Sequence, residues 1–134
     1  MTNKELKSRF DEASKPRSYK KKGNKWTLRV NQITKGIYLQ KSGYSNLYYV
    51  NYGVDFNDLD YEPGIFQLCL RCNNTLDLEV QDDSTIEIKI SECLEEIFSY
   101  LDRIENPEDA KELALSLPTL NIVPLKVKAY LELK

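Results

Sequence analysis

The feature that most constrains the fold is a stretch of alternating apolar and polar residues that begins at Lys25 and continues to Val54. Successive side chains of a β-strand point to opposite faces of a sheet, so this alternation predicts strands that bury one face. The connections within the stretch are short, which favours antiparallel neighbours because parallel strands need long crossovers. We therefore expect a β-meander. Its core positions include Trp26, Ile37, Leu39, Tyr48, Val50 and Tyr52.

Glycine and clustered polar residues predict where the meander turns. Three adjacent lysines before Gly23-Asn24 indicate a solvated turn, since Gly-Asn breaks regular structure. The first strand is then expected to run from Lys25 to about Ile33. Lys35-Gly36 would turn the chain into a second strand over Ile37–Ser42, and Gly43–Asn46 would lead into a third over Leu47–Val54.

Two further strand patterns follow the meander. Ile65–Leu70 is a short apolar run that follows an acidic loop. Within residues 76–90, apolar residues alternate with polar ones on both sides of the polar segment Gln81–Thr85. This pattern predicts a hairpin.

Helical spacing appears at both ends of the chain. Residues 3–14 place Leu6, Phe10 and Ala13 on one face. Ser91 is a suitable cap for a second helix, and Asn106-Pro107 is a typical start for a third. Residues 123–133 fit a strand or a helix, and their helix formers favour the helix. The expected fold is α+β, with an N-terminal helix, an antiparallel β-meander of four to six strands and C-terminal helices packed on one face. We expect a single domain over residues 1–134.

Composition excludes several kinds of site. The chain has no histidine, which removes the most common general base and zinc ligand. Cys69 and Cys72 have C-x-x-C spacing, but only Cys93 could join them, whereas structural zinc needs four ligands. Buried, reduced thiols are expected. The acidic loop after Val54 has Asp60 where a calcium-binding EF-hand needs glycine. We expect no cofactor and no metal.

The chain lacks the apolar segments that membrane insertion or export requires. No run approaches the roughly 18 apolar residues that span a bilayer, and the N-terminus has no apolar signal-peptide core. The sequence therefore predicts a cytoplasmic protein without membrane contact.

Charge is distributed unevenly along the chain. Residues 1–42 carry a formal charge of +9 and residues 43–134 a charge of −11, which together give −2. A fold that kept these halves apart would have one basic and one acidic surface, each able to steer partners. A fold that interleaved them would cancel the two.

Three motifs resemble a known family. They are Lys22-Gly23-Asn24-Lys25-Trp26, then Leu39-Gln40-Lys41-Ser42, then Tyr48-Tyr49-Val50-Asn51-Tyr52-Gly53-Val54. Their order resembles domain-of-unknown-function family 4304, a group of small bacterial proteins, and Arg71 stands where that family tends to place an arginine. The resemblance supplies no activity and no catalytic residues. Some relatives look like immunity proteins encoded beside bacterial effectors, which implies a toxin-neutralising role.

Strand parity places a polar group on the face opposite the predicted core. Gln40 and Ser42 share this face with Tyr49 and Asn51, and Lys22 and Lys41 would lie at its margin. Amide and hydroxyl groups can form directional hydrogen bonds to a partner. We take these six residues as the candidate binding site. The alternatives are a solvated face and a face that bonds a covering helix.

These observations favour a non-enzymatic protein-binding module, with a bacterial toxin or effector as the partner and an immunity or antitoxin-like role. Clustered acids could steer a basic partner such as a nuclease toxin. One alternative is single-stranded nucleic-acid binding through the basic Lys20–Lys41 region, with Trp26 or Tyr38 stacking on a base. Another is an enzyme that uses Asp, Glu, Lys or Tyr without histidine.

Overall fold

A computed structural model describes residues 1–62, 64–116 and 123–132. These residues form an α+β fold, as predicted. The strands are β1 (Lys20–Lys22), β2 (Lys25–Val30), β3 (Ile33–Lys41), β4 (Leu47–Phe56), β5 (Leu68–Arg71) and β6 (Leu76–Asp77). The helices are α1 (Asn3–Ser14), the short 3-10 helix η1 (Lys15–Arg17), α2 (Asp83–Leu101), α3 (Pro107–Ser116) and α4 (Leu125–Tyr130).

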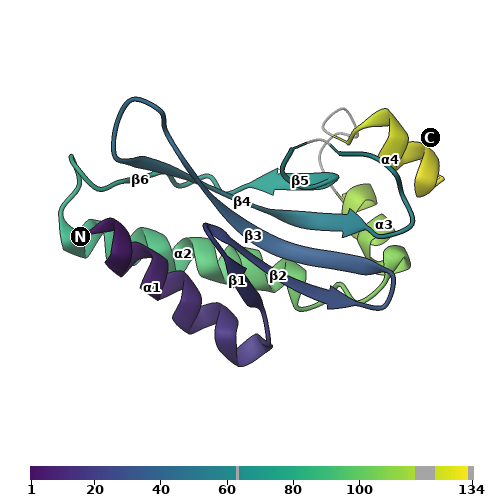
Figure 1. Cartoon of the computed structure of the whole chain (residues 1–134), viewed down its shortest axis with the longest axis horizontal. Helices are drawn as coiled ribbons and strands as arrows, with labels where there is room; N and C mark the ends of the chain where they lie inside the picture. Colours follow the sequence, from purple (N-terminus) through teal and green to yellow (C-terminus); the bar gives the residue numbers. More distant parts are fainter. Residues whose placement is uncertain (63, 117–122, 133–134) are drawn as a thin grey trace.

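The strands form one antiparallel sheet in the order β1-β2-β3-β4-β5. The short β6 pairs with the beginning of β4, through Leu47 and Tyr48, whereas β5 pairs with its second half. Helices α1 and α2 lie together against one side of the sheet, and α3 and α4 lie near one end of it (Figure 1). The predicted C-terminal helices are therefore present as α2, α3 and α4. Of these, α2 covers the same face of the sheet as α1.

The core lies between the sheet and these two helices. Trp26, Ile37 and Val50 are fully buried on the sheet side, and Leu6 and Phe10 face them from α1. The Trp26 indole nitrogen donates to the Asp11 carboxylate at 3.2 Å, so its one polar atom is paired. Helix α2 contributes Ile86, Ile90, Cys93, Ile97 and Leu101. The parity predicted for the meander is thus confirmed.

Ion pairs join the two helices and connect the basic N-terminal segment with the acidic half. Arg9 pairs with Glu87 at 2.9 Å, and Arg17 pairs with Asp102 at 3.1 Å. The opposite charges therefore interleave on this side of the molecule.

The first helix predicted over residues 3–14 is confirmed. The Thr2 hydroxyl caps it by accepting from the Glu5 amide at 3.1 Å.

Two predicted turns were wrong. The lysines at 20–22 form β1, and only Gly23 and Asn24 turn the chain. The second turn lies at Asn31-Gln32, where Asn31 has a φ of 52°, and not at Lys35-Gly36. Gly36 lies inside β3, where a Cβ would meet the Trp26 carbonyl oxygen at 2.6 Å. Close packing, rather than a turn, requires this glycine.

The predicted hairpin over residues 76–90 was also wrong. Only Leu76–Asp77 is strand, and α2 already begins at Asp83. The Asp82 carboxylate caps this helix by accepting from the Thr85 amide at 2.8 Å, so Ser91 lies inside the helix and is not its cap. Isoleucines four residues apart satisfy a helical period as well as a period of two. A strand would place Ile88 on the same buried face as Ile86 and Ile90, but Ile88 is 60% exposed.

Smaller differences concern the remaining elements. The short strand predicted over Ile65–Leu70 is found as β5, which begins at Leu68 and ends at Arg71. The predicted Asn106 cap is confirmed, because its side-chain oxygen accepts from the Asp109 amide at 2.9 Å. Within residues 123–133 the favoured helix is found as α4, while residue 133 lies outside the described residues. Cys72 and Cys93 are buried, Cys69 is half-buried, and all three are free thiols.

Candidate functional site

The surface of the sheet opposite α1 and α2, which we call the open face, carries most of the predicted site. Strand pairing places a row of side chains across it, one from each of five neighbouring strands: Lys22, Lys25, Tyr38, Asn51 and Arg71. Gln40 and Tyr49 form a pair in the adjacent row of β3 and β4. The row contains three cations and no acid.

Four of these residues form a connected group, which we call the Arg71 cluster: Gln40, Tyr49, Asn51 and Arg71. The Arg71 Nε donates to Asn51 Oδ1 at 3.0 Å, and its Nη2 donates to Gln40 Oε1 at 2.9 Å. Asn51 Nδ2 also donates to Gln40 Oε1, at 3.1 Å. The guanidinium carbon of Arg71 lies 4.6 Å from the centre of the Tyr49 ring. These contacts fix both the plane and the direction of the guanidinium group.

Burial differs sharply within the cluster. Asn51 is only 2% exposed, and its side-chain amide is paired on both its oxygen and its nitrogen. Gln40 and Tyr49 are half-buried, whereas Arg71 is exposed. Asn51 therefore holds the cluster together from beneath, and Arg71 is the member that a partner can reach.

Next to the cluster, a loop folds back over the middle of the open face. Gly36 and Gly53 are directly opposite each other on β3 and β4, and the Phe66 side chain lies over both of them. The Lys25 amine lies 4.7 Å from the centre of the Phe66 ring and donates to the Ile65 carbonyl at 3.4 Å. Two glycines thus create a slot that a phenyl ring fills.

Gln67 secures this loop to β4. Its side-chain nitrogen donates to the Leu59 and Tyr61 carbonyls at 2.9 and 2.7 Å, and its side-chain oxygen accepts from the Phe56 amide at 2.7 Å. Its backbone amide donates to the Asp55 carboxylate at 2.8 Å. Burial raises the pKa of Asp55, and the bond from Gln67 opposes that shift. The loop is a fixed border of the open face.

The other predicted site residues lie apart from the cluster. Ser42 belongs to the connection between β3 and β4, and its hydroxyl accepts from the Tyr44 amide at 3.3 Å, which is a turn contact. Lys41 pairs with Tyr48, and therefore has the opposite parity to Gln40. Lys22 lies at the far end of the row, four strands from Arg71.

The basic stretch proposed for nucleic acid does not form one surface. Lys35 is buried, and its amine donates to the Leu101 carbonyl at the C-terminal end of α2, at 2.5 Å. Burial lowers the pKa of Lys35, while Asp102 and other nearby carboxylates oppose the shift. Lys21 lies over the Trp26 ring at 5.9 Å, on the helix side of the sheet. Lys20, Lys22, Lys25 and Arg29 lie on the open face.

Sequence reasoning does not select Arg71 or Phe66 as site residues, and it names Tyr38 only for the nucleic-acid alternative. Arg71 was noted only through the family resemblance, because a predicted strand ending at Leu70 left it unplaced. The alternation of Cys69 and Arg71 with Leu68 and Leu70 was the available signal. Phe66 carries no local signal, since its role depends on two glycines distant in the sequence.

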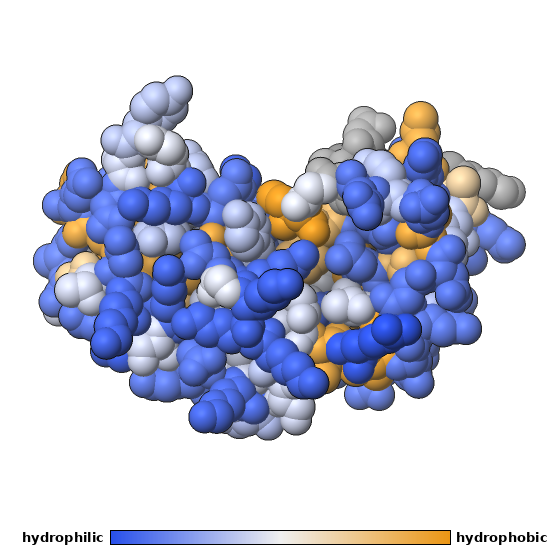
Figure 2. Space-filling view, viewed as in Figure 1, coloured by the Kyte–Doolittle hydropathy of each residue, from blue (hydrophilic) through white to orange (hydrophobic). Residues whose placement is uncertain are grey.

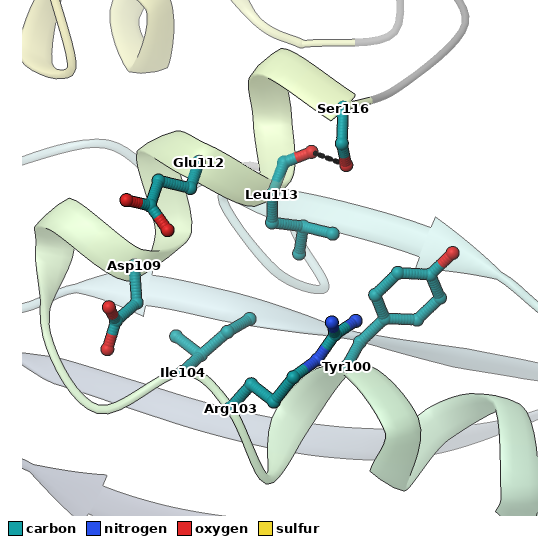
Figure 3. A pocket seen from close by; sticks show the side chains of 7 residues that line it. All are labelled: Tyr100, Arg103, Ile104, Asp109, Glu112, Leu113 and Ser116. Atoms are coloured by element: carbon teal, nitrogen blue, oxygen red, sulfur yellow. Dashed lines mark hydrogen bonds between the residues drawn. The ribbon is translucent and has the colours of Figure 1, made fainter.

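A hollow of about 180 Å³ lies between the end of α2 and α3 (Figure 3). Three of its polar side chains bond nearby backbone. Arg103 Nε donates to the Ser99 carbonyl at 2.7 Å, and Asp109 accepts from the Glu105 amide at 2.9 Å. The Ser116 hydroxyl donates to the Leu113 carbonyl at 2.6 Å. Within the described residues no ion pair joins Arg103 to an acid of this hollow. The hollow therefore lacks a coupled acid–base pair.

The described residues contain neither a cluster of potential metal ligands nor a membrane-spanning helix. No three His, Cys, Asp or Glu side chains there come together as a metal site. Among the same residues, no helix has the length and apolar character needed to cross a membrane.

Comparison with known proteins bears on β1 to β4. Residues 10–64 match the model of a domain of unknown function, DUF4304. The resemblance to family 4304 is therefore confirmed over this segment. Comparison with curated proteins and with solved structures gave no match. The DUF4304 segment supplies Gln40, Tyr49 and Asn51, whereas Arg71 lies beyond it.

Proposed function

We propose that this protein is a non-enzymatic protein-binding module and that its binding surface is the open face of the sheet. The Arg71 cluster carries the proposal. It presents an exposed, oriented guanidinium beside a half-buried Tyr49, and arginine and tyrosine are enriched in the cores of protein interfaces.

The chemistry of the cluster favours binding over catalysis. The side-chain amides of Gln40 and Asn51 do not titrate, and a guanidinium stays protonated throughout the pH range of proteins. Such groups recognise a partner but do not transfer a proton at neutral pH. Because the hydrogen bonds already fix Arg71, binding would cost little further side-chain entropy.

The shape of the surface suits a macromolecule. In Figure 2 the outline is hollowed to the right of the β3–β4 hairpin. Hydrophobic side chains are visible within this hollow, while hydrophilic ones dominate the rest of the visible surface. Compared with Figure 1, this hollow lies beside β5, the strand that carries Arg71. A protein surface can enter such a broad depression.

The family resemblance adds an immunity or antitoxin-like role, in which the partner is a cytoplasmic toxin or effector encoded beside the gene. The charge of the open face modifies our expectation about that partner. One row across the face presents Lys22, Lys25 and Arg71, while the acids that could attract a basic nuclease toxin lie on α2, on α3 and in the loop over residues 57–62 that borders the face. The site therefore favours a partner with an acidic surface.

Co-expression with the product of each adjacent gene tests this function. We expect a stable complex and, where that product is toxic, rescue of growth. The double variant Lys22→Glu, Arg71→Glu should weaken the complex at least tenfold. The matched control Lys4→Glu, Lys15→Glu, with the same charge change on exposed positions next to or within α1, should bind like the wild type.

Two results would refute the proposal. One is the absence of any complex or rescue with the adjacent gene products. The other is equal weakening of the complex in both double variants, which would show that binding depends on net charge and not on the open face. Steeply salt-dependent binding of single-stranded DNA or RNA that requires Lys22 would instead support the nucleic-acid alternative.

A further inference from the structure

We infer that the Arg71 guanidinium binds a carboxylate of the partner protein through two parallel hydrogen bonds, an arrangement we call the fork. The carboxylate would belong to an Asp or Glu side chain or to a chain terminus. This inference rests on the proposed function, because it names the chemistry that the open face recognises. It depends on which edge of the guanidinium group is already occupied.

A guanidinium group offers two edges that can each make a pair of parallel hydrogen bonds. One edge consists of Nε and the neighbouring hydrogen of Nη2, and the other consists of Nη1 with the second hydrogen of Nη2. In this protein Nε donates to Asn51 and Nη2 donates to Gln40, at 3.0 and 2.9 Å. The first edge is therefore saturated by two side-chain oxygens of the same face.

The second edge remains for a ligand. Arg71 is an exposed residue, and none of the hydrogen bonds among the described residues uses its Nη1. Tyr49 lies 4.6 Å from the guanidinium carbon and supports one side of its plane. Two outward N–H groups in a fixed plane match the two oxygens of a carboxylate, which accept bidentate hydrogen bonds from arginine.

Charge around the fork favours an anion. Arg9 and Arg17 are each paired with a carboxylate, but no ion pair within the described residues involves Arg71. The row that ends at Arg71 also carries Lys22 and Lys25. Asp55, two rows away on β4, directs a carboxylate oxygen to the Gln67 amide. The Asp55 carboxylate is therefore already engaged, and the row that ends at Arg71 contains no acid.

Gln40, Asn51 and Tyr49 act as positioning residues in this arrangement. Lysine at position 71 would keep the charge but could not present two parallel, coplanar N–H donors. Glutamine would lose both the charge and the parallel donor pair. A binding preference for carboxylate should therefore depend on arginine specifically and on the amide that orients it.

Peptide probes test the inference without the natural partner. Two six-residue peptides that differ only in having two glutamates or two glutamines are titrated into isotopically labelled protein, and the Arg71 Nε–H signal is followed by NMR. We expect the glutamate peptide to bind at least tenfold more tightly and to shift that signal saturably. Arg71→Gln should abolish the preference, Arg71→Lys should reduce it at least fivefold, and Gln40→Ala should reduce it by a smaller factor.

Several outcomes would overturn the fork. They are equal affinity for both peptides, a preference that survives Arg71→Gln, or tighter binding of inorganic phosphate or a single-stranded oligonucleotide than of the glutamate peptide. The natural complex separates this failure from failure of the proposed function. If Lys22→Glu weakens that complex while Arg71→Gln does not, the open face binds the partner but the fork is wrong. Melting temperatures of all variants within a few degrees of the wild type confirm that each is folded.

Discussion

Replacing Gly36 by alanine tests the account of how the open face is built. The added Cβ would lie 2.6 Å from the Trp26 carbonyl oxygen and 3.1 Å from two atoms of the Phe66 ring. Real Cβ atoms essentially never lie within 3.0 Å of a heavy atom outside their own residue and its chain neighbours. The Trp26 carbonyl belongs to the backbone of the neighbouring strand and cannot rotate away. β2 and Phe66 must therefore both move.

The cost follows from these contacts. Overpacking a well-packed interior typically costs about 1–3 kcal/mol. We expect about 3 kcal/mol here, because one contact is with backbone and because Trp26, at the centre of the core, would shift with its strand. Unfolding entropy is about 2.1 cal/mol/K per residue, so for 134 residues the loss corresponds to a melting temperature lower by about 11 °C.

Thermal unfolding and urea denaturation measure this effect. Gly43→Ala is the matched control, because a Cβ there meets nothing within 4 Å and its φ is not positive. It should change stability by less than about 0.5 kcal/mol. If Gly36→Ala were no less stable than Gly43→Ala, the close approach of Trp26, Phe66 and β3 described here would be incorrect.

Three further predictions concern buried hydroxyl groups and pH. Tyr52→Phe removes the hydrogen bond to Glu96 at 2.8 Å and should lower the free energy of unfolding by about 1–2 kcal/mol at neutral pH, as urea denaturation would show. Tyr19→Phe should be neutral or stabilising by up to about 1 kcal/mol, because no described residue hydrogen-bonds its buried hydroxyl; a loss above 1 kcal/mol would contradict this. Burial raises the pKa values of Tyr19 and Tyr52 above their ordinary value of 10.0, so above pH 10 the unfolded chain loses protons that the folded protein keeps. Stability should therefore fall as pH rises from 10 to 11, and less steeply in Tyr52→Phe; equal slopes would refute the assignment.

Much of the sheet could be predicted because its core faces follow a local rule. Trp26, Ile37 and Val50 are buried as the alternation required, and Asn106 caps α3 as its sequence indicated. Prediction failed where two rules fit the same residues. Ile86 and Ile90 satisfy both a strand and a helix period, and the Asp82 cap decided between them.

The candidate site was predictable only in its local part. Parity alone placed Gln40, Tyr49 and Asn51 on one face, since they lie on two strands joined by a short turn. The contribution of Arg71 depends on the register of β5 against β4, which pairs it with Asn51 across twenty residues of sequence. Gly36 resembled a turn residue for the same reason, because Phe66 and Trp26 approach it only after folding.

The burial of Trp26 and Ile37 also bears on what an excised fragment could do. Residues 10–64 contain the side of the core that the sheet supplies. The Ile86, Ile90 and Ile97 side chains that cover it come from α2. A chain ending at residue 64 would also lack β5 and the Phe66 ring above Gly36 and Gly53. Such a fragment would expose both surfaces of the sheet to water and to other copies of itself. The stretch by which this protein is matched to DUF4304 is therefore shorter than the stretch that must fold together.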